Sequence, residues 1–469
     1  MAAGLLCAAM VACYDYDDIP LAGGADLALV DFSTDVTTRA NTLIDDTAAL
    51  KKTTGIGVFA YFTDEKPWAE ATAKATTAEY FMYNQRVTWG VQRVDTLNVD
   101  GEPVGTPAYG WIYSPPKYWP NSSGNAEPRY ISFFAYAPYV AEPESGAGVI
   151  GMPDTENWLP HLKYKTGTVG NMVDLLYAEP VFDATRNGHG LIEVKDGKNQ
   201  YQKVLLEFHH ALACVEVYIQ RGYEEPHFSG NVLKDKGTKL FVSQLELASK
   251  SDIYDEGVLD LAYSTPEKTT SGDDASGNGA GSDSPEKGLW SDLKSSLDKK
   301  LTYTEELFND SISGTTKTEL LVIADRELNK WGLADYGVDE KERCLFKNGD
   351  ALFFLPQTLE LTPTLTYTMV TRDNELVLSD YTDKSGNKYA RIAHNVTGNT
   401  LKLNVQQGKR YKLLIHVDVE HVSCEVVSVT DWDFPLRFDP SVVSDFNEEN
   451  KNHTLDEHNH EQNEENKAD

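Results

Sequence analysis

The sequence predicts an all-β fold built from β-sandwiches, and three observations lead to this prediction. Apolar residues recur at every second position in many short runs, turn-forming residues separate these runs, and helical periodicity is scarce. The chain has 469 residues, which is more than one ordinary hydrophobic core holds, so we expect two domains and a tail. Hydrophobic residues make up 41% of the chain, enough for most of it to pack into cores.

The clearest predicted strand covers residues 410–420. Tyr411, Leu413 and Ile415 share one face of this strand, and polar residues alternate with them. Short strands of this kind, separated by Gly, Pro, Asn and Asp turns, are typical of β-sandwiches. Helical content is expected only in residues 293–301 and 326–333. Further runs with the strand alternation begin at Ile56, Tyr130, Leu365, Leu401 and Cys424.

The alternation changes its parity within residues 205–219. Leu206 and Phe208 are apolar on one parity, whereas Val215 and Val217 are apolar on the other. Since a one-residue slip turns every side chain to the opposite face, the run needs a bulge or a corner near Leu212. A strand that passes from one sandwich to the next has this pattern.

The N-terminal residues indicate a leader and a lipid anchor. Residues 1–12 are small or apolar and uncharged, which suits the apolar region of a signal peptide, and Cys13 ends a segment that resembles a bacterial lipobox. Signal peptidase II would cut before Cys13, whose thiol would carry the lipid. No Lys or Arg precedes Arg39, so the usual positive start is missing. The alternative is a buried apolar strand at the N-terminus.

Two segments lack apolar periodicity. Residues 264–288 are rich in Gly, Ser and Asp, so we expect a flexible loop or a short linker. Residues 447–469 are almost wholly polar or charged. We therefore expect a disordered acidic tail over residues 441–469.

Composition and motifs argue against catalysis and against nucleic-acid binding. The formal net charge is −31, and no Lys/Arg cluster stands out. We find no nucleophile elbow, zinc-protease helix, Walker loop or dinucleotide fingerprint, so we predict no enzyme, no cofactor and no bound metal. His209 and His210 are neighbours on a predicted strand, where adjacent side chains point to opposite faces, so we interpret them as structural histidines.

The cysteines do not predict a dense disulfide framework. None of the five forms a C-x-x-C pair, which excludes thioredoxin-like and zinc-ribbon patterns. Cys214, Cys344 and Cys424 either share a single bridge or are buried free thiols.

Aromatic residues are concentrated in residues 109–120, which contain two Trp, three Tyr and three Pro. Trp111, Tyr113, Tyr118 and Trp119 are candidate contacts for a glycan. The favoured alternative is a Pro-interrupted edge strand that packs its rings into the domain.

Taken in order, these segments resemble the fimbrillin family of pilin-like surface lipoproteins. The resemblance implies two tandem transthyretin-like β-sandwich domains, which we place at residues 40–200 and 201–440, and a role in pili that serve adhesion or biofilm formation. It also implies no catalysis. The matching motifs cover residues 55–62, 83–89, 111–120, 131–139, 174–178, 205–219, 353–358 and 429–435.

The resemblance implies a role in maturation for Arg39, the first basic residue of the chain. In this family a secreted Arg-specific protease cuts beyond the lipidated cysteine, and Arg39–Ala40 matches that site. The cut would release the first strand, for which residues 25–34 alternate suitably, and a strand from another subunit would take its place. Residues 13–39 would then be a lipidated propeptide. The alternative is that Arg39 is an ordinary exposed loop residue.

Several questions of role stay open at this stage. The polar C-terminus favours a tip or accessory subunit as much as a shaft pilin, and an anchor subunit is a third option. The expected location is the cell surface, first as an outer-membrane lipoprotein and then in the fimbrium, with other fimbrial subunits as partners. A monomeric surface lipoprotein that binds a glycan is the alternative function. Asp-Ser/Thr-aliphatic triplets mark Thr47, Thr96 and Ser311 as candidate O-glycosylation sites.

Overall fold

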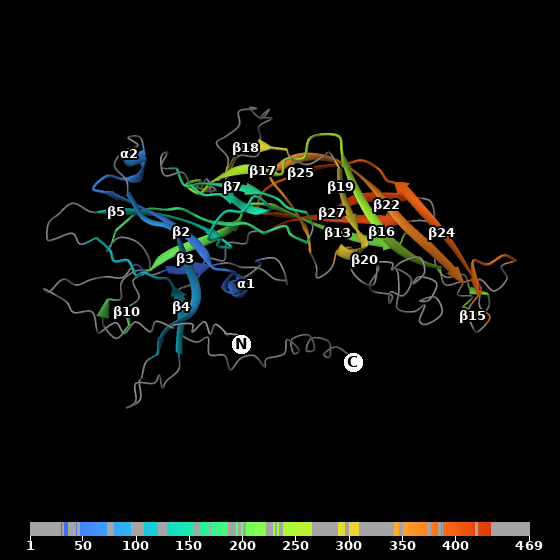
Figure 1. The fold of residues 1–469 in the computed structure, drawn as a ribbon, viewed down its shortest axis with the longest axis horizontal. Coiled ribbons are helices and arrows are strands. Elements are labelled where there is room, and N and C mark those ends of the chain that lie inside the picture. Colours follow the sequence, from blue (N-terminus) through green and yellow to red (C-terminus); the bar gives the residue numbers. More distant parts are fainter. Residues whose placement is uncertain are drawn as a thin grey trace, which may run out of the picture. The chain divides into compact units, whose positions relative to one another are not determined.

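In the residues that a computed structural model describes, nearly all regular elements are β-strands (Figure 1), which confirms the predicted all-β class. Contacts group the chain into a first unit, Met1–Pro435, and a second, Leu436–Asp469, in which no residue is described. The described residues are 30, 32–35, 44, 47–72, 79–94, 107–120, 129–153, 159–168, 170–185, 194–195, 198–199, 203–221, 228–229, 232–233, 238–264, 289–295, 300–308, 342–346, 350–372, 377–382, 386, 388–417 and 421–432.

The largest sheet comes from the first part of the chain. In sheet order it runs β1-β12-β8-β5-β2-β3-β4, and β9 also pairs with β5. Its members are β1 (Phe32–Asp35), β2 (Ile56–Asp64), β3 (Glu79–Val94), β4 (Pro107–Ile112), β5 (Tyr130–Ala137), β8 (Leu176–Ala178), β9 (Val181–Ala184) and β12 (Val204–His210).

The central strands of this sheet are buried on both faces. In β2, Val58 belongs to one hydrophobic core and its neighbour Phe59 to another. Phe133 and Phe134 of β5 divide in the same way. Apolar residues at consecutive positions are therefore required here, because each side chain enters the core on its own face.

A second sheet packs against one of these faces. It has the order β18-β17-β7-β6 and consists of β6 (Gly148–Gly151), β7 (His161–Lys165), β17 (Glu256–Asp260) and β18 (Trp290–Lys294). Leu162 and Leu259 of this sheet share a core with Phe59 of β2. Two strands of this sheet, β6 and β7, precede residue 200, whereas β17 and β18 follow it. The sheet thus contains strands from both predicted domains, residues 40–200 and 201–440, and that division stays a prediction.

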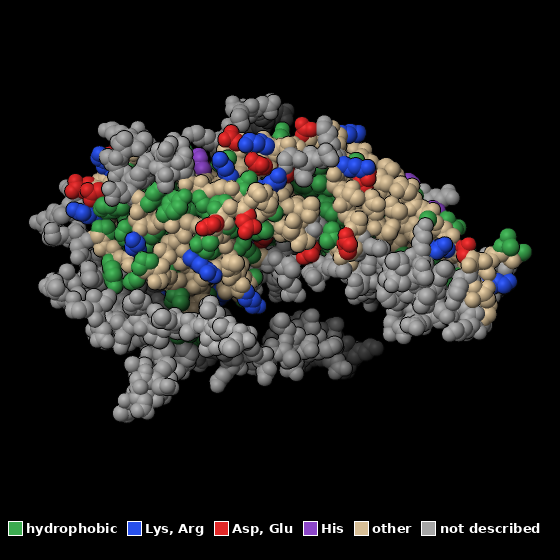
Figure 2. Space-filling view, viewed as in Figure 1, with side chains coloured by type: hydrophobic (Ala, Val, Ile, Leu, Met, Phe, Trp, Pro, Cys, Tyr) green, Lys and Arg blue, Asp and Glu red, His purple; other side chains and the backbone are tan. Residues whose placement is uncertain are grey.

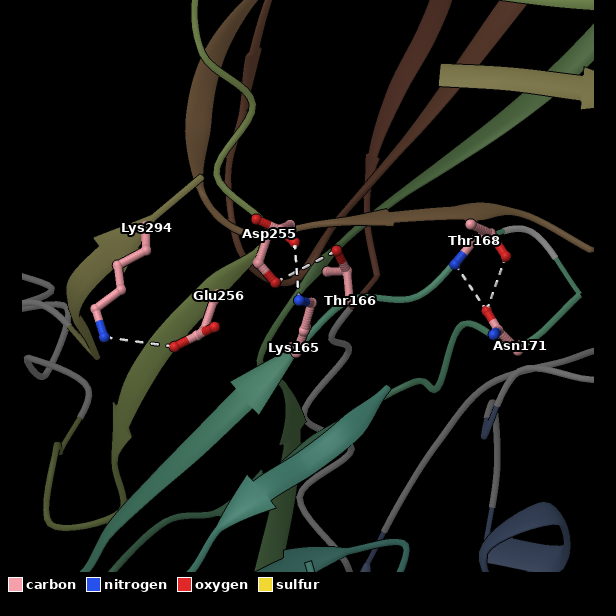
Figure 3. A network of polar contacts seen from close by, with 7 residues as sticks. All are labelled: Lys165, Thr166, Thr168, Asn171, Asp255, Glu256 and Lys294. Atoms are coloured by element: carbon pink, nitrogen blue, oxygen red, sulfur yellow. Dashed lines mark hydrogen bonds and ion pairs between the residues drawn. The ribbon is translucent and has the colours of Figure 1, made fainter. Parts of the chain in front are cut away.

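Polar contacts join β7 to the start of β17 (Figure 3). The carboxylate of Asp255 is fully buried, and its Oδ2 lies 3.8 Å from Nζ of Lys165. The backbone N–H of Thr166 donates to the carbonyl of Asp255 at 2.8 Å. A buried carboxylate needs such a partner, because its desolvation is otherwise uncompensated.

The later part of the chain forms two sheets that enclose one core. Val215 and Leu413 line this core from the first sheet, and Leu245 and Leu365 line it from the second, as in a β-sandwich. The first sheet contains β13 (Ala213–Arg221), β20 (Glu342–Cys344), β21 (Leu352–Phe354), β26 (Lys409–Val417) and β27 (Val422–Asp431). The second contains β16 (Thr238–Ser249), β19 (Lys300–Thr304), β22 (Gln357–Arg372), β23 (Tyr381–Thr382), β24 (Lys388–Thr397) and β25 (Leu401–Val405).

Smaller elements complete the described structure. They are the ribbons β10 (Val194–Lys195) with β11 (Lys198–Asn199) and β14 (Phe228–Ser229) with β15 (Val232–Leu233), the helices α1 (Thr47–Lys52) and α2 (Trp68–Thr72), and the 3-10 turn η1 (Glu305–Leu307).

The predicted corner near Leu212 is confirmed. β12 ends at His210 in the largest sheet, and β13 begins at Ala213 in the sandwich. The N–H of Ala211 donates to the carbonyl of Leu175 at 2.8 Å, and the N–H of Gly408 donates to the carbonyl of Leu212 at 3.0 Å. The change of parity in the sequence is therefore the point where one strand passes from one sheet to another.

The helix expected over residues 293–301 is wrong at both of its described ends, since Lys300 and Leu301 begin β19. Trp290–Lys294 form β18, and Lys294 pairs with Glu256 of β17. Tertiary pairing overrides local helix propensity here. The second expected helix, 326–333, the loop after Ser264 up to residue 288, and the tail 441–469 lie outside the described residues.

We predict that Gly57→Ala destabilises the protein. A Cβ at Gly57 would lie 2.2 Å from Cε1 of Tyr136, whose phenol bonds to Asn84 at 2.9 Å and cannot easily move. The free energy of unfolding should fall by about 1–3 kcal/mol, as for overpacked cores. Urea unfolding measures this loss. Gly146→Ala is the control, because nothing lies within 4 Å of its added Cβ.

We predict that the Cys424 thiol resists alkylation in the folded protein. The described cysteines Cys214, Cys344 and Cys424 are free thiols. Burial raises the pKa of Cys424 to about 12, so at pH 8 the reactive thiolate is rarer than for an exposed thiol with a pKa of about 8.5. Iodoacetamide labelling followed by mass spectrometry should show Cys424 reacting only when urea is added. Labelling of native Cys424 at the rate of the unfolded thiol would contradict this.

Candidate site for strand exchange

The first strand, β1, ends the largest sheet and pairs with one neighbour. It runs parallel to β12, with Phe32 opposite Val204 and Asp35 opposite Glu207. β12 pairs on its other side with β8, through Phe208 to His210. β1 therefore covers an edge of β12 that no other described strand occupies.

Val30, just before β1, bonds to a segment that continues from the opposite end of the sheet. Its N–H donates to the carbonyl of Lys117 at 2.9 Å. Its carbonyl accepts a hydrogen bond of 2.7 Å from the phenol of Tyr113. Tyr113 and Lys117 follow β4, the last strand of the sheet, so residues 30–35 join the two ends of one sheet.

The side chains of Val30 and Phe32 enter the core. Val30 and Phe32 have exposed fractions of 0% and 1%. The Phe32 ring makes edge contacts with Tyr113, at a centroid distance of 5.6 Å, and with Phe133, at 5.9 Å. β1 is thus held by pairing on β12, by the contacts of Val30 and by an aromatic pocket.

The chain beyond Arg39 is fixed by a different set of contacts. The N–H of Ile44 donates to Oδ2 of Asp174 at 3.1 Å, and Nδ1 of His210 lies 3.0 Å from Oδ1 of the same carboxylate. Leu50 of α1 is fully buried in the same core as Phe32. Residues on the two sides of Arg39 therefore share one core, but their backbone groups bond to different partners.

Asp174 and His210 form a buried junction with the last described residue. Both side chains are 3% exposed. The His210 ring stacks on Trp432, with a centroid distance of 3.6 Å and an interplanar angle of 11°. The N–H of Trp432 donates to the carbonyl of Gly408 at 2.8 Å. This junction ties β12 to the segment at Ile44 and to the end of β27.

The histidine interpretation agrees with these contacts. His210 has the Asp174 partner, and Nε2 of His209 lies 3.8 Å from Oε1 of Glu179. The two neighbours thus meet different partners. The described residues contain no cluster of His, Cys, Asp and Glu that fits a metal ion.

The four candidate glycan contacts divide into two pairs. Trp111 and Trp119 are 4% and 3% exposed and belong to the core of the largest sheet, which agrees with the packing interpretation. Tyr113 and Tyr118 are half-buried, and the Tyr113 phenol is used by Val30. A ring that stacks on a sugar needs an open face, which the two buried indoles do not offer.

The remaining predicted site residues are mostly outside the described part of the chain. These are Cys13, Arg39, Ala40, Thr96 and Ser311. Thr47 is described, as the half-buried first residue of α1. The sequence did not single out Phe32 or Asp174, although Phe32 lies in the alternating run 25–34.

Charged side chains of both signs lie close together on the visible face of the molecule (Figure 2). Figure 2 shows basic and acidic side chains intermingled on the visible face, without a basic cluster among the coloured residues. None of the helices in the described ranges is long and apolar enough to span a membrane.

The fold and the site together describe an all-β protein whose first described strand closes one edge of the largest sheet. The chain is 22% identical over 404 residues to fimbrium subunit Fim1C of Phocaeicola vulgatus, which covers 80% of this chain and 86% of that protein. This relative confirms the resemblance to the fimbrillins that the sequence motifs indicated. No family model matches the chain.

Two solved structures also resemble the chain. A fimbrial protein from Bacteroides vulgatus has 18% identity and a TM-score of 0.49, with 86% of this chain and 99% of that chain covered. The C-terminally truncated tip fimbrial protein Mfa3 from Porphyromonas gingivalis has 9% identity and a TM-score of 0.29, with 86% and 100% covered.

We predict that Asp174→Ala destabilises the protein strongly. The substitution leaves the His210 ring and the Ile44 N–H buried without their hydrogen-bond partner, and each buried polar group left unsatisfied costs about 1–3 kcal/mol. Urea unfolding measures this loss, and hydrogen exchange at residues 44–52 should accelerate.

The matched control is Glu425→Ala. Glu425 is 61% exposed and lies 2.9 Å from Nε2 of His416, so it also pairs with a histidine, but in water. Its removal should cost less than about 1 kcal/mol. Equal losses for the two variants would contradict the assigned role of the buried junction.

Proposed function

We propose that this chain is a fimbrial subunit that accepts a strand from another subunit after losing β1. The observation that carries the proposal is the position of β1, which closes the largest sheet but pairs with β12 alone among the described strands. The name of the curated relative, a fimbrium subunit, supports the same role.

In the proposed maturation, Cys13 is lipidated and the chain is later cut after Arg39. Arg39 lies between β1 and Ile44, whose backbone groups bond to different partners, so Ile44 would keep its bond to Asp174 after a cut there. Residues 13–39 would leave with β1, and Ala40 would become the new N-terminus. The lipid would anchor the uncut chain to the outer membrane.

Loss of β1 would leave polar backbone groups without partners. Residues 204–207 of β12 would lose their pairing with β1, and the carbonyl of Lys117 would lose the N–H of Val30. Unpaired groups at a sheet edge are satisfied when another extended segment adds to that edge. The incoming segment would also refill the space of Phe32, so apolar burial would favour its binding to the vacated site.

We further propose that the mature chain is a tip or accessory subunit at the cell surface and that it serves adhesion or biofilm formation. Its partners would be other fimbrial subunits. The polar composition of residues 447–469, which lack the apolar alternation of a donor strand, supports this role. Two domains, residues 40–200 and 201–440, are part of the proposal. One core that draws on residues 30–208 and another that draws on residues 213–424 support it.

The test is the mature N-terminus of the protein taken from the native cell surface. Mass spectrometry should find a chain that begins at Ala40 in assembled fimbriae. A chain in fimbriae that begins at lipidated Cys13 would contradict the proposed removal of β1.

We predict that Arg39→Gln blocks both maturation and assembly. An arginine-specific protease does not cut at Gln, so the chain should keep β1, stay lipid-anchored and be absent from purified fimbriae. Immunoblots of fimbriae and of outer membranes measure the two pools. Lys52→Gln is the matched control, because it also removes one positive charge but lies at the exposed end of α1, outside the predicted cleavage segment, and its distribution should match that of the unchanged protein.

A further inference from the structure

We infer that the site vacated by β1 selects the incoming strand by an aromatic side chain at the position of Phe32. The inference rests on the proposed strand exchange and names the chemistry of the segment that fits. The preferred segment has an apolar residue, then any residue, then an aromatic residue, as Val30 to Phe32 do.

The backbone contacts of the site cannot make this choice. Pairing with residues 204–207 of β12 uses N–H and C=O groups, which every residue except proline carries. The bonds of Val30 to Lys117 and to the Tyr113 phenol also use backbone atoms of the bound strand. Main-chain bonds thus supply affinity, and the side-chain pockets supply specificity.

The pocket around Phe32 is aromatic on more than one side. Tyr113 meets the Phe32 ring at an interplanar angle of 65°, and Phe133 meets it at 82°. Trp119 extends the same cluster, because its ring lies edge-on to Phe133 at 5.8 Å. Edge-to-face geometry favours a ring over an aliphatic side chain of similar area, since the positive edge of one ring meets the negative face of the other.

Tyr113, which forms one side of the pocket, keeps hydrogen-bond partners when β1 leaves. The Tyr113 phenol lies 3.3 Å from the carbonyl of Lys117 and accepts from the N–H of Lys117 at 3.3 Å, besides bonding to Val30. Loss of Val30 therefore leaves the phenol with contacts inside its own turn. A Tyr113 side chain that is already fixed favours incoming side chains of one shape, because its own ordering costs little free energy on binding.

The experiment uses the full chain, cut at Arg39 with an arginine-specific protease. Labelled peptides of residues 25–35 are exchanged into the cut protein, and fluorescence anisotropy gives their dissociation constants. The unchanged peptide is compared with the Phe32→Ala, Phe32→Leu and Val30→Ala peptides. Asp31→Asn is the matched control, because residue 31 falls on the opposite parity from both buried residues. Variation in the peptide leaves the folded chain unaltered.

The Phe32→Ala peptide should bind about a hundredfold more weakly or worse, as expected for a buried phenylalanine cut back to alanine. The Phe32→Leu peptide keeps apolar area but loses the ring contacts, and it should bind about three- to tenfold more weakly. Val30→Ala should weaken binding less than Phe32→Ala, and Asp31→Asn should bind like the unchanged peptide.

Two results would overturn the inference while leaving strand exchange intact. One is a Phe32→Ala peptide that binds as tightly as the unchanged one. The other is a Phe32→Leu peptide of unchanged affinity, which would mean selection by apolar volume alone. If no peptide binds, the unchanged one included, exchange at this site is itself contradicted and the inference falls with it.

Discussion

The largest sheet depends on a closing contact made by residues 30–35. β1 covers the edge of β12, Val30 bonds to the turn after β4, and Phe32 fills an aromatic pocket between them. Each of these contacts could be made by a segment that is not covalently joined to the sheet. The same physics that closes the fold therefore allows its closing strand to be exchanged, because backbone pairing and apolar burial do not depend on chain connectivity.

Two sets of contacts that do not involve β1 join the other parts of the structure. The corner at Ala211 joins the largest sheet to the sandwich, and the Asp174–His210 pair joins β12 to Ile44 and to Trp432. A subunit that gives up its first strand must keep the new start of its chain in place. Asp174 does this through a backbone bond that any residue at position 44 except proline would supply.

The sequence predicted the strands well and the long-range pairs poorly. Period-2 patterns located β2, β5, β25 and β26, because burial of alternate residues leaves a local trace, and the change of parity located the corner. Asp174 and His210 are far apart in the sequence, and neither leaves a local pattern. Leu293 and Lys294, at the end of β18, were predicted as the start of a helix because the cross-strand partner, β17, lies beyond the window in which propensity is judged. The Pro-rich context of Trp111 and Trp119 favoured their burial. The sequence did not indicate which face of the sheet the two indoles would occupy.

The central claim is that β1 can leave while the remaining fold persists. Hydrogen exchange of the full chain tests it most directly, before and after a cut at Arg39 and removal of the released segment. The account predicts faster exchange at residues 204–207 of β12 and unchanged protection in β13 and β26, which belong to the sandwich. Loss of protection throughout the chain, or no change at residues 204–207, would contradict it.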